Sequence, residues 1–323
     1  MTTAARVLVW TVAVAVVVVL VALAVPVASG AYVVAQLVSF RAVLGLGAAA
    51  LATLLLAVPV TRRRLLPVTV ALAVGALAQG AVLVTRSVPQ HTSAPDSGDQ
   101  LVVLSFNTLD TVDAGLLAAL ALEHGADVVV LPETSGYTAR MTAKRLAAAG
   151  SPMQLLAAEG NTSFIAGTAL LVAGHVGTYP IAEPLPTRLG SLRADPEDPL
   201  TSPVIVAAHP MAPVSRRAMP PWRTETRLVA TTCAETPGAI VAGDLNATLD
   251  HPGLRELGPC VDAARAAGAA ALGTWPSDVP ALLAAPIDHV LVDGRAWRVV
   301  AFQVLPRTGG SDHRPVLATL ARR

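Results

Sequence analysis

Long runs of apolar residues dominate the first third of the chain. Three of these runs contain no charged residue: 7–28, 42–60 and 65–85. Each is long enough to cross a bilayer as a helix, which takes about 20 apolar residues. The first run is longer than the apolar core of a cleaved signal peptide, and two further spans follow it. A shorter apolar piece, 31–40, is either interfacial or an extension of the second helix. We therefore predict three transmembrane helices within residues 1–86.

From residue 101 onward, the apolar residues form short runs that alternate with helix-like stretches. Buried strands are expected at 101–106, 127–131, 167–173, 204–209, 239–243, 287–292, 297–304 and 315–320. Helices are expected at 113–124 and 223–235. Residues 87–100 contain Pro, Ser and Asp without apolar periodicity and are expected to be a linker. This alternation predicts a layered α/β domain over 101–323.

Charged residues are distributed unevenly along the chain. All 22 acidic residues follow residue 95, and the only charged residues before that position are arginines. With three spans, Arg6 and the run 62–64 lie on one side of the membrane. Arg41 and Arg86 lie on the other side. The positive-inside rule then favours a cytoplasmic N-terminus, with the α/β domain outside the cytoplasm.

The α/β domain contains the only two cysteines, Cys233 and Cys260. In an oxidising compartment they could form a disulfide, although two buried thiols are a comparable alternative. Of the 23 basic residues, 17 follow residue 95, against 22 acidic residues, which leaves a net charge of −5 on this part. Nucleic-acid-binding domains usually have a basic face, so this charge gives no positive argument for a nuclease.

Polar side chains lie at the ends of six predicted strands. They are Asn107, Glu133, His209, Asp244, Asn246, Asp288, Asp312 and His313. Active sites of α/β folds collect at strand ends, where loops carry polar groups above a rigid sheet. Each residue alone also fits a turn or a satisfied core position. Asp288 is the exception, because a carboxylate within an apolar strand is costly unless it is paired. Their joint occurrence predicts a catalytic site.

The residue types of this set favour a hard divalent cation. Glu133 is the best ligand candidate, Asn107 offers a neutral oxygen and Asp312 a second carboxylate. Oxygen donors without a Cys/His cluster favour Mg²⁺ or Mn²⁺ over Zn²⁺. His313 is the candidate general base, since an imidazole titrates near neutral pH and can take a proton from water.

The motifs around these residues, in their order along the chain, resemble those of the endonuclease/exonuclease/phosphatase superfamily. They are LSFNTL (104–109), LPET (131–134), AHP (208–210), GDLN (243–246), IDHVLV (287–292) and SDHRPV (311–316). This superfamily of metal-dependent phosphoesterases includes pancreatic deoxyribonuclease and the apurinic endonucleases. The resemblance covers about residues 100–323. It implies a four-layer α/β sandwich of two packed mixed β-sheets flanked by helices, here preceded by the three transmembrane helices.

The resemblance also implies roles for individual residues. Asp288 orients His313, and Asp244 orients the water or assists proton transfer. Asn246 and His209 bind phosphate oxygens, and His209 could also protonate the leaving oxygen. In the nuclease branch that histidine has a carboxylate partner, for which the candidates here are Glu159 and Glu183.

Four further residues lie near these motifs. Trp275, in GTWP, either lines the substrate cleft or packs in the core. His289 is expected to be structural, because in a strand it points to the opposite face from Asp288. His251 and Arg255 either border the pocket or lie at the surface, and the surface is the favoured alternative.

These observations predict a membrane-anchored, extracytoplasmic phosphoesterase that uses Mg²⁺ or Mn²⁺. Its partners are a phosphoester substrate and the membrane. Alternatives are an extracellular nuclease and a lipid phosphodiesterase, such as one acting on sphingomyelin. A non-catalytic scaffold of the same fold is disfavoured, because all the main positions of the site are present.

Overall fold

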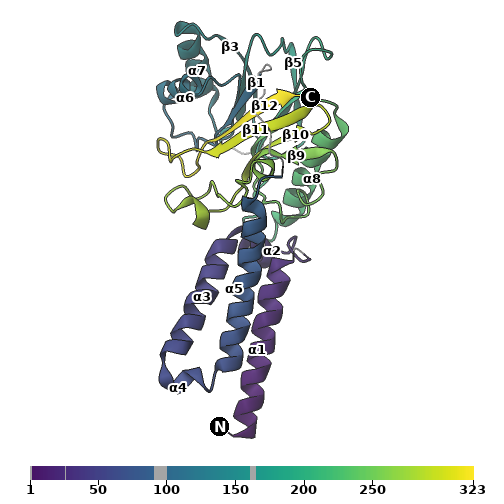
Figure 1. Cartoon of the computed structure of the whole chain (residues 1–323). Coiled ribbons are helices and arrows are strands. Elements are labelled where there is room, and N and C mark those ends of the chain that lie inside the picture. The colour runs from purple at the N-terminus through teal and green to yellow at the C-terminus, as the bar shows by residue number, and fades with distance from the viewer. Residues whose placement is uncertain (1, 26, 91–99, 161–164) are drawn as a thin grey trace.

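Apolar helices form a stalk beneath an α/β domain (Figure 1). The computed structural model describes residues 2–25, 27–90, 100–160 and 165–323. The stalk helices are α1 (Thr3–Ala24), α2 (Tyr32–Ser39), α3 (Arg41–Ala57), α4 (Pro59–Arg62) and α5 (Leu66–Ser87). Two of them in the described part, α1 and α5, are each long and apolar enough to cross a membrane. The bent pair α2 and α3 passes the same test only when taken together, which gives up to three candidate spans.

The second predicted span differs most from the structure. Helix α3 ends at Ala57, before the expected end at residue 60, and Pro59 begins the short helix α4. Proline lacks the backbone N–H that a continued helix requires. Helix α2 meets α3 at 80°, so the piece 31–40 is not a straight extension of the second helix. It lies instead where the stalk meets the α/β domain (Figure 1).

The α/β domain contains two six-stranded mixed sheets. The first has the order β11-β12-β1-β2-β4-β3, with β1 (Gln100–Ser105), β2 (Val128–Leu131), β3 (Met153–Ala158), β4 (Thr168–Ala173), β11 (Trp297–Val304) and β12 (Val316–Arg322). The second has the order β5-β6-β7-β8-β10-β9, with β5 (Ile181–Leu185), β6 (Ser191–Asp195), β7 (Ile205–Ala208), β8 (Ile240–Asp244), β9 (Cys260–Asp262) and β10 (Asp288–Asp293). The remaining elements are α6 (Ala114–Glu123), α7 (Gly136–Ala148), α8 (Met219–Glu235), α9 (Ala263–Ala266) and the 3₁₀ helix η1 (Ala281–Leu283).

Alternating strand residues build the layers. Val103 belongs to the core between the two sheets, whereas the next residue, Leu104, packs with residues of α6 and α7. On the second sheet, Val241 packs against α8 through Trp222 and Val229. This alternation follows from the two-residue period of a strand, which points successive side chains to opposite faces. The helix–sheet–sheet–helix order confirms the four-layer α/β sandwich.

Each sheet has one parallel pair near its centre. These pairs are β1 with β2 and β7 with β8, and the other neighbouring strands are antiparallel. Both strands of a parallel pair end at the same edge of their sheet. The polar residues that follow these four strands are therefore brought to one end of the sandwich.

A disulfide links Cys233 of α8 to Cys260 of β9, with 6.2 Å between the two Cα atoms. It fastens the covering helix to an edge strand of the second sheet. The cysteines are thus paired in this structure, not free thiols.

A buried ion cluster ties the stalk to the domain. Asp250 Oδ1 lies 2.6 Å from Arg41 Nη2 and 2.7 Å from Arg86 Nη2. His251, next in sequence, is also buried, and its Nε2 lies 3.1 Å from the Ala35 carbonyl oxygen of α2. The expectation that His251 lies at the surface is wrong, because the stalk covers it. Of the predicted linker 87–100, Ser87 still belongs to α5, and residues 91–99 lie outside the described part.

Candidate active site

The structure brings the polar residues of the strand ends together at one end of the sandwich. Asn107 and Glu133 follow β1 and β2 of the first sheet, while Asp312 and His313 precede β12. The second sheet supplies four more: His209 after β7, Asp244 and Asn246 at the end of β8, and Asp288 at the start of β10. Six of these side chains line a cleft of about 270 Å³. Asn107 and Asp288 lie behind that surface and hydrogen-bond to residues that line it.

Asn107 connects the two sheets. Its Nδ2 donates to Glu133 Oε1 and to Asp244 Oδ2, at 3.0 Å each. Its Oδ1 accepts from the Leu109 backbone N–H at 3.0 Å. The oxygen that we expected Asn107 to offer a metal therefore faces the backbone. In this arrangement Asn107 positions two carboxylates.

Glu133 has a left-handed backbone, with φ of 51°. Residues other than glycine adopt this region rarely and at a cost, often at functional sites. Two hydrogen bonds hold its carbonyl oxygen there, from Thr108 Oγ1 at 2.6 Å and from the Asp110 N–H at 2.7 Å. The turn aims the Glu133 side chain at the second sheet.

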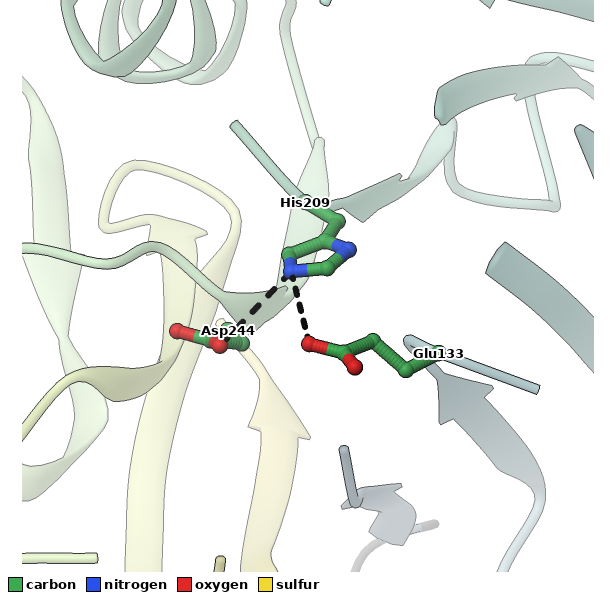
Figure 2. A group of neighbouring side chains, drawn as sticks. All are labelled: Glu133, His209 and Asp244. Atoms are coloured by element: carbon green, nitrogen blue, oxygen red, sulfur yellow. Dashed lines mark ion pairs between the residues drawn. The ribbon is translucent and has the colours of Figure 1, made fainter. Parts of the chain in front are cut away.

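Glu133, His209 and Asp244 form one compact group (Figure 2). His209 Nε2 lies 3.6 Å from Glu133 Oε1 and 3.7 Å from Asp244 Oδ2, both longer than a hydrogen bond. Burial raises the pKa of Glu133, and the neighbouring carboxylates of Asp244 and Asp312 raise it further. Burial also raises the pKa of Asp244. Two buried carboxylates therefore converge here, and Asn107 and His313 offset their charge only in part.

His209 is fully buried, and burial lowers its pKa to about 4 although the Asp244 carboxylate opposes this shift. The imidazole is thus neutral at neutral pH, and the two close carboxylates are not salt-bridge partners there. A neutral imidazole can donate an N–H to a phosphate oxygen but is a poor acid. Protonation of the leaving oxygen by His209 stays a prediction.

The expected carboxylate partner of His209 is neither of the two candidates. No hydrogen bond or ion pair joins His209 to Glu159 or Glu183 in the described residues. Glu183 instead lies opposite Arg193 in the β5–β6 pair, at the far edge of the sheet. The carboxylates near His209 Nε2 are those of Glu133 and Asp244.

His313 is held by Asp288. Its Nδ1 lies 2.8 Å from Asp288 Oδ2, and its Nε2 lies 3.7 Å from Asp244 Oδ2. Asp288 and Asp244 are directly opposite each other in the β8–β10 pair, which places both carboxylates beside one imidazole. Burial lowers the pKa of His313, but Asp288 and Asp244 outweigh it and raise the pKa to about 10. Without added positive charge nearby, this imidazole is a cation at neutral pH.

The walls of the site position the remaining groups. Trp275 lines the cleft, and its Nε1 donates to Asp312 Oδ2 at 2.8 Å. Asn246, with φ of 49°, donates from Nδ2 to the Pro210 carbonyl oxygen at 3.1 Å. His289 points away from the cleft, with Nδ1 2.7 Å from Asp262 Oδ2, as its place in the strand predicts.

Three cleft residues that sequence reasoning missed come from the stalk. Gln36, Ser39 and Phe40 line the cleft together with the polar group. They precede the motif-bearing segment by more than 60 residues. No local sequence pattern connects them to the site, because only the packing of the stalk on the domain brings them there.

The site residues fit a divalent metal. Within the described residues, His, Asp and Glu side chains form two groups able to hold an ion: Glu133, His209 and Asp244, and Asp244, Asp288 and His313. Asp312 Oδ1 and Asp288 Oδ1 are buried without a hydrogen-bond partner in the described structure. Buried carboxylate oxygens with unmet acceptor capacity are the donors that hard cations prefer.

Comparisons with known proteins agree with this geometry. Residues 104–313 match the sequence pattern of the Endonuclease/Exonuclease/phosphatase family. A solved endonuclease/exonuclease/phosphatase from Beutenbergia cavernae has 22% identity and a TM-score of 0.53, over 69% of this chain and 72% of that chain. D. rerio TDP2 complexed with single strand DNA product has 17% identity and a TM-score of 0.54, over 70% of this chain and 100% of that chain.

A mannosyl-6-phosphatase from Bacteroides thetaiotaomicron has 15% identity and a TM-score of 0.51, over 68% of this chain and 99% of that chain. These structural similarities establish the sandwich fold. No curated protein matches the chain. The family match spans all the residues of the site from Asn107 to His313. The chain belongs to the endonuclease/exonuclease/phosphatase family and is a phosphoesterase, a hydrolase that acts on phosphoric esters.

Proposed function

We propose that this chain is a membrane-anchored, extracytoplasmic phosphoesterase that depends on Mg²⁺ or Mn²⁺. The observation that carries the proposal is the convergence of Glu133, Asp244, His209 and the Asp288–His313 pair in one buried cleft. Phosphoester hydrolysis needs an activated water, compensation of charge on the phosphate, and positioned partners for its oxygens.

His313 is the proposed general base. Asp288 accepts a hydrogen bond from Nδ1 and leaves Nε2 facing the cleft, where it can take a proton from the attacking water. This role requires a neutral imidazole. Asp288 and Asp244 raise the pKa of His313. A divalent cation bound among the carboxylates would oppose this rise and favour the neutral imidazole. Asp244, beside Nε2, orients the water, while Asn246 and the neutral His209 bind phosphate oxygens.

Glu133 and Asp312 are the proposed metal ligands, with Asn107 as a third through a rearranged amide. A bound divalent cation supplies positive charge that stabilises the phosphate and favours ionisation of water. The oxygen donors favour Mg²⁺ or Mn²⁺.

Two observations support an extracytoplasmic domain. The disulfide between Cys233 and Cys260 is typical of an oxidising compartment. The other is the run of exposed arginines 62–64 at the end of the stalk opposite the domain, which the positive-inside rule places in the cytoplasm.

The proposal is tested with the purified full chain on bis(4-nitrophenyl) phosphate and 4-nitrophenyl phosphate. We expect hydrolysis of at least one ester, loss of activity with a chelator, and recovery when Mg²⁺ or Mn²⁺ is restored. Activity that persists after complete metal removal contradicts the metal dependence. No hydrolysis of either ester under any metal contradicts the proposed activity.

A further inference from the structure

The stalk forms one wall of the active-site cleft. Gln36, Ser39 and Phe40 line the same cleft as Glu133 and His313. A membrane anchor that only tethers the domain has no need to enter the site. Here the cleft is completed by a segment that belongs to the membrane part of the chain.

Hydrogen bonds and ring packing fix this wall in place. Gln36 Nε2 donates to the Pro213 carbonyl oxygen at 2.7 Å, and Tyr32 Oη to the Val214 carbonyl oxygen at 3.3 Å. The Phe40 ring centroid lies 6.2 Å from that of Trp275, whose indole N–H holds Asp312. Phe40 therefore packs against the residue that hydrogen-bonds to Asp312, a proposed metal ligand.

The stalk wall of the cleft lies next to the apolar part of the stalk. Phe40 directly precedes α3, and Val43, within the first turn of α3, is exposed on the stalk. Because a helix rises 1.5 Å per residue, the apolar part of the stalk begins within about one turn of the cleft. The domain adds exposed apolar side chains nearby: Leu282 of η1, which contacts α3, and Val214, beside Tyr32 of α2.

The lining of the cleft suits an amphiphile better than a polyanion. Apart from the polar group, its walls are largely apolar, and they include Phe40, Trp275 and Ile287. None of the described lining residues is Arg or Lys, the residues that supply most contacts to nucleic-acid phosphates. Its 270 Å³ is just below the usual range of ligand pockets, about 300–1,000 Å³. A headgroup fits, and a long chain must leave through the mouth.

We infer that the cleft takes a phosphoester that carries an apolar chain, drawn from the membrane that holds the stalk, and that Phe40 and Trp275 contact the start of that chain. The inference rests on the proposed function. It makes the membrane segment a determinant of substrate specificity, with the phosphate at the polar group and the chain directed toward the bilayer.

The first test uses methyl and octyl 4-nitrophenyl phosphate with the full chain in phosphatidylcholine vesicles. We expect kcat/KM for the octyl ester to exceed that for the methyl ester by about 30-fold, because several methylenes become buried. In Phe40→Ala this ratio falls at least about fivefold, and Phe40→Leu largely restores it. The ratio is taken within one preparation, so a partly misfolded variant still reports it.

Leu54→Ala is the control, since this exposed residue of α3 lies in the stalk away from the cleft. It keeps the wild-type ratio, which separates contact in the cleft from general partitioning into the vesicle. A wild-type ratio near one overturns the inference, and so does a ratio that Phe40→Ala leaves unchanged. No hydrolysis of either ester overturns the inference, whereas the proposed function falls only if bis(4-nitrophenyl) phosphate and 4-nitrophenyl phosphate also resist hydrolysis.

The second test identifies the source of the substrate. Hexadecyl 4-nitrophenyl phosphate is placed either in the vesicles that contain the full chain or in separate vesicles. We expect hydrolysis to be at least about tenfold faster when enzyme and ester share a membrane. Equal rates show that the ester is taken from water and overturn the membrane source.

Discussion

His313 Nδ1 lies 2.8 Å from Asp288 Oδ2, and Asp288 is the first residue of a strand whose register places it opposite Asp244. One imidazole therefore faces two buried carboxylates from neighbouring strands. The first carboxylate orients the ring, and the second lies near the nitrogen that faces the cleft. This arrangement accounts for a carboxylate within an apolar strand, since burial is tolerated when the charge has a hydrogen-bonded partner.

The Asp288–His313 pair predicts the effect of Asp288→Asn. The Asp288 carboxylate raises the pKa of His313, so its removal lowers that pKa. Loss of the orienting charge should reduce kcat for phosphoester hydrolysis by about 10²- to 10⁴-fold. NMR titration of the His313 ring and steady-state kinetics measure the two effects. Asp198→Asn, an exposed substitution, is the matched control. An unchanged His313 titration contradicts the pairing.

If Glu133 is a metal ligand, the substitution Glu133→Gln should reduce metal affinity. Glutamine keeps the shape of the side chain and the Asn107 contact but removes the charge that a divalent cation requires. We expect Mn²⁺ binding, followed by electron paramagnetic resonance, to weaken at least about tenfold. Glu123→Gln, at the exposed end of α6, serves as control. Equal Mn²⁺ affinity in the two variants is inconsistent with Glu133 as a ligand.

The disulfide predicts both a compartment and a stability difference. Cys233 and Cys260 are 27 residues apart, and cross-linking a loop of that length stabilises a fold by about 3.6 kcal/mol in the chain-entropy model. Reduction of the purified chain should therefore lower its thermal unfolding temperature. In intact cells, the two cysteines should resist thiol labelling until a reductant is added. Fully reduced cysteines in cells argue against an oxidising compartment.

The ion cluster at Asp250 predicts that the stalk and domain separate in Asp250→Asn. This substitution leaves Arg41 and Arg86 buried without their carboxylate, a defect that typically costs about 3–5 kcal/mol. We expect faster hydrogen exchange in α2 and in the segment around His251. Asp278→Asn, at an exposed position, should leave exchange unchanged. Unaltered exchange in Asp250→Asn shows that other contacts suffice for docking.

The same cluster has a defined pH dependence. Burial alone raises the pKa of Asp250, but Arg41 and Arg86 outweigh it and lower the pKa below the ordinary value of 3.8. A group with a lowered folded-state pKa stabilises the fold above its unfolded pKa. That stabilisation is lost as the pH falls through the folded-state value. Docking should therefore persist at pH 5 and weaken only below the ordinary carboxyl range.

The central strands of the fold were predictable from sequence because burial on both faces makes them continuously apolar. β2, with the sequence VVVL, is an example. The strands β3, β5 and β9 were missed for separate reasons: β3 has no β-branched or aromatic residue, β5 contains Glu and Pro, and β9 has only three residues. β6 was missed because its sequence, SLRAD, mixes polar and apolar residues. Strand ends and motif order predicted the polar group of the site.

The tertiary arrangement around the site was not predictable. The amide orientation of Asn107 depends on the Leu109 backbone N–H, and the low pKa of His209 depends on complete burial. The contribution of Phe40 depends on an 80° bend between two stalk helices and on packing across more than 200 residues of sequence, to Trp275. These properties arise from contacts between distant segments, which a single sequence does not specify.

The most direct measurement of the central claim is the kcat of His313→Ala on bis(4-nitrophenyl) phosphate with saturating Mg²⁺, beside the wild type and His175→Ala. The His175 side chain is 69% exposed and lies near Asp127, outside the cleft. We predict that His313→Ala loses at least about 10³-fold in kcat, as expected when a general base is removed, while His175→Ala stays within about twofold of wild type. Wild-type kcat in His313→Ala would contradict the assignment of this cleft as the catalytic site.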